Sequence, residues 1–148
     1  MKKILVFLLL VLLLSGCGRR VNQNSAAAHL GEPTSVQIIS EDYPAVTIRD
    51  KGQIRDVMAI LEKTEVRKLS YDEEVNLVLV QGKTLNAIEL RFRDSRGNEF
   101  KALLLDDGSV LVVEGARGES EQRRDLFLSE PGQQELVNQI QKQIISPQ

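Results

Sequence analysis

Residues 87–114 read AIELRFRDSRGNEFKALLLDDGSVLVVE, and this stretch decides the fold. It contains three apolar or alternating runs, at 87–93, 99–105 and 109–114, separated by two turn sequences rich in Asp, Asn and Gly. Runs of this length between turn residues are typical of β-strands, and Asp-Gly between apolar runs is a strong hairpin signal. The stretch therefore predicts a three-stranded antiparallel meander.

The register of the first hairpin follows from the apolar pattern, because the side chains of a strand alternate between two faces. Pairing Phe92 with Phe100 gathers the apolar residues on one face, whereas a shift of one residue would set Phe92 against Glu99. The pairs are then Phe92–Phe100, Leu90–Ala102 and Ile88–Leu104 on the apolar face, with Arg93–Glu99 and Arg91–Lys101 on the reverse face. We assign the apolar face to the side that the helices cover.

The second turn is interpreted as a two-residue type I′ turn centred on Asp107 and Gly108. It pairs Leu105 with Val110, Leu104 with Leu111 and Leu103 with Val112. Four aliphatic residues then gather on the reverse face: Leu103, Leu105, Val110 and Val112. Contiguous exposed apolar patches are uncommon on monomers, so we expect internal cover by residues 115–124 or by an N-terminal strand. The alternative is that these four residues form a partner surface.

Two amphipathic helices are expected on either side of the meander. The first follows Asp50, which has capping-box spacing to Gln53, and the second follows Ser129, with Pro131 in its first turn. Apolar residues recur at helical spacing in both helices. The expected buried stripes are Ile54, Val57, Met58 and Leu61 in the first helix and Leu136, Val137, Ile140 and Ile144 in the second.

Further short strands are expected at 36–40, 46–49, 66–71, 75–81 and 125–128. Residues 75–81 are apolar on both faces, which is typical of a central strand, and a short helix from Asp72 is the alternative. Runs of strands between helices indicate an α+β fold: an antiparallel sheet with a β-meander and two amphipathic helices packed on one face. Residues 34–148 are long enough for a single domain with its own core.

Composition and charge narrow the functional classes. The chain holds 19 Lys and Arg against 21 Asp and Glu, its formal net charge is −2, and only 4% of its residues are aromatic. Because a basic block and aromatic residues for base stacking are both missing, we expect no nucleic-acid partner. Cys17 is the single cysteine, so no disulfide staples the domain.

The remaining polar residues predict no catalytic, cofactor or metal site. His29 is the only histidine and is expected in a tether, which excludes a His-based triad or zinc site. The acidic runs 72–74 and 106–107 lack the spacing of a calcium loop, and we interpret them as a charged loop and a turn. The glycines at 115–118 lack the lysine of a phosphate-binding P-loop.

The loop that follows the meander is basic. Arg117, Arg123 and Arg124 could meet an anionic partner such as a lipid head group or a cell-wall polymer, and a solvated loop is the alternative interpretation. We favour the solvated loop.

The N-terminus has the organisation of an export signal. Lys2 and Lys3 precede an apolar run at 4–14 that is too short to span a bilayer, and small residues then lead to Cys17. The tetrad Leu14-Ser15-Gly16-Cys17 resembles the lipobox of bacterial lipoproteins that signal peptidase II processes. The resemblance covers the first 18 residues. It implies that residues 1–16 are a signal peptide and that Cys17 is acylated, becomes the first mature residue and anchors the chain in a lipid bilayer.

Residues 17–33 are expected to form the lipidated cysteine and a flexible tether, because 22–28 are small and polar without an apolar period. Arg19 and Arg20 lie next to the anchor, where anionic head groups could attract them. The unit at 126–144 loosely resembles the end of small secreted lipoproteins of unknown function.

These features predict a membrane-anchored extracytoplasmic lipoprotein, at the cell surface or in the periplasm. Its domain is expected to be a non-enzymatic binding or accessory module for an envelope protein or polymer. The alternative is a small hydrolase that acts on cell-envelope material. A deep cleft with converging polar groups would favour the hydrolase, and a flat or apolar surface patch would favour the binding module.

Overall fold

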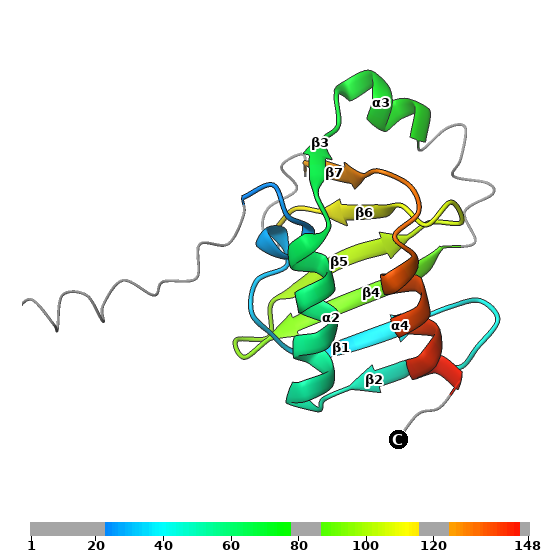
Figure 1. Ribbon diagram of the computed structural model, residues 1–148. Helices are drawn as coiled ribbons and strands as arrows, with labels where there is room; N and C mark the ends of the chain where they lie inside the picture. The colour runs from blue at the N-terminus through cyan, green and yellow to red at the C-terminus, as the bar shows by residue number, and fades with distance from the viewer. Residues whose placement is uncertain (1–22, 78–86, 116–124, 146–148) are drawn as a thin grey trace, which may run out of the picture.

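The computed structural model describes residues 23–77, 87–115 and 125–145. Within these ranges the chain forms one antiparallel sheet of seven strands in the order β2-β1-β4-β5-β6-β7-β3 (Figure 1). The strands are β1 (Pro33–Ile39), β2 (Val46–Ile48), β3 (Val66–Lys68), β4 (Ile88–Asp94), β5 (Glu99–Leu104), β6 (Val110–Val113) and β7 (Leu126–Ser129). The helices are the 3₁₀ helix η1 (Ala26–His29), α2 (Lys51–Lys63), α3 (Tyr71–Asn76) and α4 (Gln134–Ile145). The predicted α+β architecture is confirmed.

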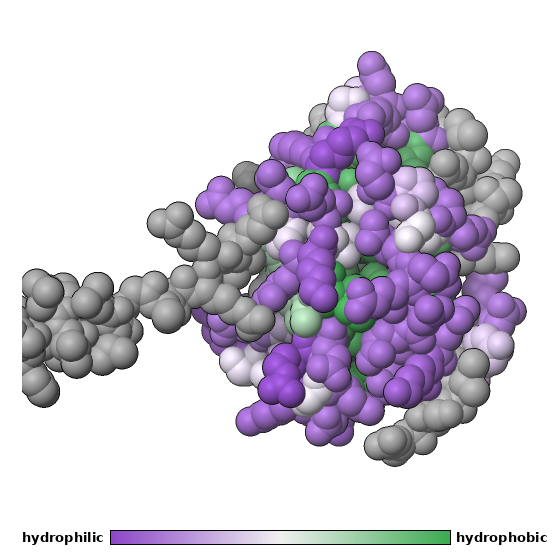
Figure 2. Space-filling view, in the orientation of Figure 1, coloured by the Kyte–Doolittle hydropathy of each residue, from purple (hydrophilic) through white to green (hydrophobic). Residues whose placement is uncertain are grey.

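Helices α2 and α4 lie side by side on one face of the sheet (Figure 1). The Asp50 carboxylate accepts a hydrogen bond of 2.9 Å from the Gln53 N–H, and this cap starts α2 where the sequence predicts it. The buried stripes are largely those expected: Ile54, Val57, Leu61, Leu136 and Ile140 are buried, and Met58 and Val137 are partly buried against them. The side chain of Ile144 lies outside the described residues. Figure 2 shows this side of the molecule, where apolar side chains are visible between two hydrophilic helix surfaces.

The first hairpin of the meander has the predicted register. Phe92 pairs with Phe100 and Arg93 with Glu99, and the remaining pairs follow in step. Phe92 is fully buried on the helical side, so matching the apolar residues was sufficient to place every pair of this hairpin.

The predicted register of the second hairpin is wrong by one residue. Leu104 pairs with Val110, so the loop consists of residues 106–108 instead of two residues. A type I′ turn needs φ > 0 at both central residues, whereas in this loop only Gly108, at φ +79°, has a positive φ. The Asp107 carboxylate accepts hydrogen bonds from the N–H and the hydroxyl of Ser109, at 2.8 and 2.6 Å, and these bonds stabilise the longer loop.

This shift separates the four residues that a two-residue turn would place on one surface. Val110 and Val112 are fully buried in the core beneath the helices. Leu105 belongs to a second buried cluster on the other side of the sheet, and Leu103 packs against it. That cluster comprises Leu69, Leu77, Leu105 and Leu111, with Ala87, Leu103, Leu126 and Leu128 partly buried around it. The predicted partner surface of Leu103, Leu105, Val110 and Val112 therefore does not form.

The segment after β3 forms a helix where a strand is predicted. Ser70 and Glu73 make a capping box: the Ser70 hydroxyl accepts from the Glu73 N–H at 3.4 Å, and the Glu73 carboxylate accepts from the Ser70 N–H at 2.8 Å. This box starts α3 at Tyr71, soon after β3 ends at Lys68. The predicted strand 75–81 is wrong over 75–77, and 78–81 lie outside the described residues. The alternative of a short helix near Asp72 is confirmed.

Ser129 does not cap the last helix. It is the final residue of β7, and its hydroxyl accepts a hydrogen bond of 2.8 Å from the buried Val110 N–H. Gly132, at φ +85°, redirects the chain, and α4 begins at Gln134. The Gly132 N–H donates to the Asp107 carbonyl oxygen at 3.0 Å, so the β5–β6 loop positions the start of α4.

The packed domain begins earlier than predicted. Over residues 23–33, the described part of the segment assigned to the tether, four residues are buried: Ser25, Ala26, Ala27 and Leu30. Helix η1 packs against α2 and β6, and Ser25 forms a β-bridge with Glu65. The expected tether of 17–33 is therefore wrong beyond about residue 24. A four-residue 3₁₀ helix has no apolar period, which is why this segment resembles a linker in sequence.

Candidate functional site

The half of the sheet formed by β2, β1, β4 and β5 is polar on the side away from the helices. This follows from strand alternation, because the neighbours of the buried residues in β1 and β4 are hydroxyl, amide or charged residues, with the exception of Ile39 at the end of β1. They line a small hollow of about 230 Å³. We call the lining residues the polar sheet face: Ser35, Gln37, Thr47, Arg49, Arg91, Arg93 and Glu99. In the described part of the chain, α2 and α4 both lie on the opposite side (Figure 1).

Charges on and beside the polar sheet face are paired across β4 and β5. Arg91 lies directly opposite Lys101, and such a like-charge pair destabilises a hairpin on its own. Glu89 offsets this repulsion, since it accepts a hydrogen bond from Arg91 and lies 3.1 Å from the Lys101 Nζ. Burial alone would raise the pKa of Glu89, but the hydrogen bonds from Arg91 and Lys101 lower it overall. Arg93 and Glu99 form a further ion pair at 3.1 Å.

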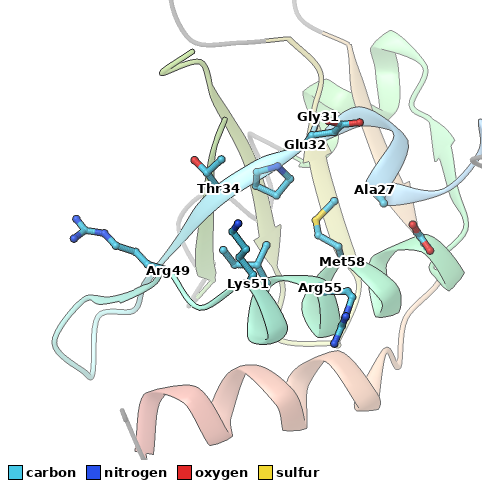
Figure 3. Close-up of a pocket in the computed structure, with 11 residues that line it drawn as sticks. Ala27, Gly31, Glu32, Thr34, Arg49, Lys51, Arg55 and Met58 are labelled. Carbon is cyan, nitrogen blue, oxygen red and sulfur yellow. The ribbon is translucent and has the colours of Figure 1, made fainter. Parts of the chain in front are cut away.

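A larger groove, of about 570 Å³, lies on the helical side of the molecule. It runs between α2 and the segment that joins η1 to β1 (Figure 3). We call it the α2 groove, and it is lined by Ala27, Gly31, Glu32, Pro33 and Thr34 on one wall and by Arg49, Lys51, Ile54, Arg55, Met58 and Glu62 on the other. The groove exists because η1 is packed into the core, which places the segment after η1 beside α2. The N-terminal wall of the groove therefore comes largely from residues that the sequence assigned to the tether.

Basic side chains border the α2 groove along its helical wall. Arg49, Lys51 and Arg55 are exposed, and in the described ranges no ion pair or side-chain hydrogen bond engages any of them. In Figure 3, Lys51 extends toward the β1 wall, whereas Arg49 and Arg55 extend outward from the rim. Glu32 on the opposite wall and Glu62 are the two carboxylates. The helical wall thus places one cation in the groove and two more at its rim.

His29 is a packing residue rather than part of a tether. Its ring stacks on Phe127 with the ring centroids 3.9 Å apart, and its Nδ1 lies 3.3 Å from the Glu114 Oε1. Its Nε2 is buried and lacks a hydrogen-bond partner among the described residues. A general base must reach the proton that it abstracts, and a buried Nε2 does not meet that condition in this geometry.

The acidic runs have structural roles. Glu73 caps α3 and pairs with Arg67 at 2.8 Å, and Asp107 stabilises the β5–β6 loop. Among the residues that the structure describes, no three His, Cys, Asp or Glu side chains gather where they could hold a metal ion. The loop arginines Arg117, Arg123 and Arg124 lie outside the described residues, as does Cys17.

The N-terminus is the part of the chain that matches a known family. A family model of the prokaryotic membrane lipoprotein lipid attachment site matches residues 1–17, with Cys17 as the last residue matched. The chain is thus a membrane-anchored lipoprotein. No curated protein and no solved structure matches it, so the loose resemblance of 126–144 to small secreted lipoproteins gains no support. In the described part of this lipoprotein, no helix combines the length and the apolar character needed to cross a membrane.

The sequence predicted which charged residues of β4 and β5 share one face of the sheet, but not that the helices leave this face uncovered. The predicted register of the first hairpin already set Arg93 against Glu99 and Arg91 against Lys101. Their exposure depends on which face the helices leave open, and this is a property of the packed fold. The α2 groove gave no local signal, because its two walls are separated in sequence and one wall resembles a linker.

Proposed function

We propose that this lipoprotein is a non-enzymatic binding or accessory module that holds an envelope protein or polymer against its polar sheet face. The domain lies on the outer side of the membrane that carries its anchor. The lipid attachment site supports this location, because a signal peptide directs the chain across the membrane before Cys17 becomes the anchor.

The observation that carries the proposal is the contrast between the two faces of the sheet. One face is covered by α2 and α4, whereas the other presents three arginines and one glutamate beside one glutamine, one serine and one threonine. Arginine binds carboxylate and phosphate groups through parallel hydrogen bonds, and hydroxyl and amide groups add neutral donors and acceptors. A hollow of about 230 Å³ is smaller than the roughly 300–1,000 Å³ of small-molecule sites, so a surface with these groups suits an extended anionic partner better.

The state of the carboxylates favours binding over hydrolysis. Glu99 pairs with Arg93, and Glu89 pairs with both Arg91 and Lys101, so these acids serve as counter-ions. A glycoside hydrolase uses one carboxylic acid whose pKa is raised so that it can donate a proton. The pKa of Glu89 is shifted in the opposite direction.

Photo-crosslinking in cells tests the proposal on the full-length, lipidated protein. A photoreactive amino acid at Thr47, which is exposed on the polar sheet face, is expected to capture one defined envelope protein or polymer. The control position is Asp56, which is exposed on α2 on the other side of the sheet. Arg93→Glu should abolish capture from Thr47, whereas Arg96→Glu, outside the polar sheet face, should leave it unchanged.

Two results would contradict binding through this face: equal capture from Thr47 and Asp56, or capture that Arg93→Glu does not reduce. Cleavage of isolated envelope material by the purified lipoprotein, lost in Glu99→Gln, would establish the hydrolase alternative instead.

A further inference from the structure

We propose that the α2 groove binds an anionic phospholipid of the bilayer in which Cys17 is anchored. The groove lies on the helical side of the sheet, away from most of the polar sheet face, and only Arg49 lines both. Lipid binding in the groove and partner binding on the sheet can therefore succeed or fail independently.

Chain length keeps the groove close to the bilayer. The domain is packed from Ser25 onward, which is eight residues after Cys17 in the sequence. An extended chain spans at most about 3.6 Å per residue, so Ser25 stays within about 29 Å of the acylated residue. The N-terminal wall of the groove begins two residues later, at Ala27. A tether this short gives bilayer lipids a high effective concentration at the groove, so a weak site is occupied.

The helical wall provides the chemistry for a phosphate group. Lys51 is the first residue of α2, a helix of 13 residues, and the dipole at its N-terminus adds positive potential beside the ammonium group. Arg55 lies about one turn further along the same helix, and Arg49 lies just before the residue that caps the helix. The carboxylate of Asp50, which lies between Arg49 and Lys51, already accepts the Gln53 N–H. Basic residues near a membrane are attracted to anionic head groups.

Apolar residues from both walls form what we call the floor of the groove, and this floor provides the chemistry for the acyl region of the same lipid. Ile54 is buried, Pro33 and Met58 are partly buried, and Ala27 completes the apolar lining. The thioether of Met58 is flexible and adapts to irregular apolar ligands. A volume of about 570 Å³ lies within the range of roughly 300–1,000 Å³ that ligand sites occupy. Cations beside an apolar floor match the junction of a phospholipid head group and its acyl chain, whereas a free anion would leave this floor unused.

Photoreactive lipids test the assignment on the mature, lipidated protein in phosphatidylcholine vesicles. Each vesicle preparation carries a small fraction of either phosphatidylglycerol or phosphatidylcholine with the same photoreactive acyl chain. We expect phosphatidylglycerol to label the peptides that contain Met58 and residues 31–34 about tenfold more than phosphatidylcholine does. Excess inorganic phosphate should not displace this label.

Charge-reversal variants make the test specific. The double variant Lys51→Glu/Arg55→Glu should reduce phosphatidylglycerol labelling to the level of phosphatidylcholine. Lys63→Glu, at the exposed C-terminal end of the same helix, is the matched control and should label normally. An acidic residue is favourable in the first turn of a helix, so Lys51→Glu should not unfold α2, and circular dichroism verifies this.

Equal labelling by the two lipids would overturn the proposal, as would labelling spread evenly over the domain or unaffected by the double variant. Displacement by inorganic phosphate would show that the site holds a free anion and not a lipid. None of these results would affect capture from Thr47 on the polar sheet face, so the proposed function is tested separately.

Discussion

The hydroxyl of Ser129 accepts a hydrogen bond of 2.8 Å from the N–H of Val110, which joins the end of β7 to the start of β6 inside the core. Ser129→Ala leaves this buried N–H without its acceptor, so we expect a loss of about 1–3 kcal/mol in the free energy of unfolding. Urea denaturation measures the loss. Ser95→Ala, in the exposed β4–β5 turn, is the control and should change the stability by less than about 0.5 kcal/mol. Equal effects of the two substitutions would show that the Ser129 hydrogen bond contributes nothing.

Gly31 should tolerate no side chain. Its φ is +64°, and a Cβ at this position would lie 2.9 Å from the Phe100 ring. Gly31→Ala should cost about 1–2 kcal/mol for the left-handed backbone and more for the displaced ring. Gly97→Ala separates the two costs, because Gly97 has φ +84° but open space around its Cβ. Thermal unfolding should therefore show a larger loss for Gly31→Ala, and equal losses would contradict the contact with Phe100.

Removing the Glu89 charge should destabilise the first hairpin. In Glu89→Gln, Arg91 and Lys101 face each other without a counter-ion, which should cost up to about 1 kcal/mol and less at high salt. Because the pKa of Glu89 is lowered in the folded state, its contribution is present above the pKa of an unfolded glutamate and is lost as the pH falls through the lower folded value. Stability curves against pH for wild type and Glu89→Gln should converge in acid. Glu41→Gln, at an exposed position, should leave the curve unchanged.

The Glu73 carboxyl should titrate far below its ordinary range. Hydrogen bonds from Arg67, and then from the N–H and hydroxyl of Ser70, lower its pKa from 4.5 to about 2. The charged carboxylate therefore supports α3 above about pH 4.5, and this support is lost as the pH falls toward 2. Carboxyl carbon chemical shifts measured by NMR should give a midpoint near 2, and Arg67→Gln should raise it. A midpoint near 4.5 in the unmodified protein would contradict the capping geometry.

Cys17→Ala should abolish the anchor. The chain has no other cysteine, so no second thiol can receive a diacylglyceryl group. We expect the variant to remain uncut by the lipoprotein signal peptidase and to incorporate no radiolabelled palmitate, whereas the wild type does both. Palmitate incorporation that persists in the variant would contradict acylation at this residue.

The sequence was most informative where one local interaction decided the structure. Asp50 and Gln53 fixed the start of α2 through one capping hydrogen bond. The match of Phe92 with Phe100 fixed the first hairpin, because a shift of one residue would set Phe92 against Glu99. The second hairpin failed because Asp107 and Gly108 are compatible with two loop lengths. The choice between them came from the Ser109 hydrogen bonds and from contact with Gly132, which is distant in sequence.

The candidate sites were less accessible to sequence reasoning. Arg91 and Arg93 were placed on one face correctly, but whether that face is covered depends on the path of both helices. The α2 groove forms because Ala27 and Gly31 lie opposite Met58. Ala27 belongs to a 3₁₀ helix of four residues, which is too short to show a periodic sequence pattern, so the groove could not be predicted. Ser129 was misassigned because a serine in this position can either end a strand or cap the helix that follows. The neighbouring residues do not distinguish the two roles.

The attachment of the N-terminal segment to β3 determines how the domain bears mechanical load. The Val66 N–H donates to the Asn24 carbonyl oxygen at 2.7 Å, and the Ala26 N–H donates to the Thr64 carbonyl oxygen at 2.9 Å. A force applied between the membrane anchor and the domain would act through these two hydrogen bonds, at the edge strand farthest from β2. Leu30, a few residues further along the chain, is fully buried in the core and resists extraction. We expect such a force to peel the N-terminal segment from the edge of the sheet before it separates the central strands.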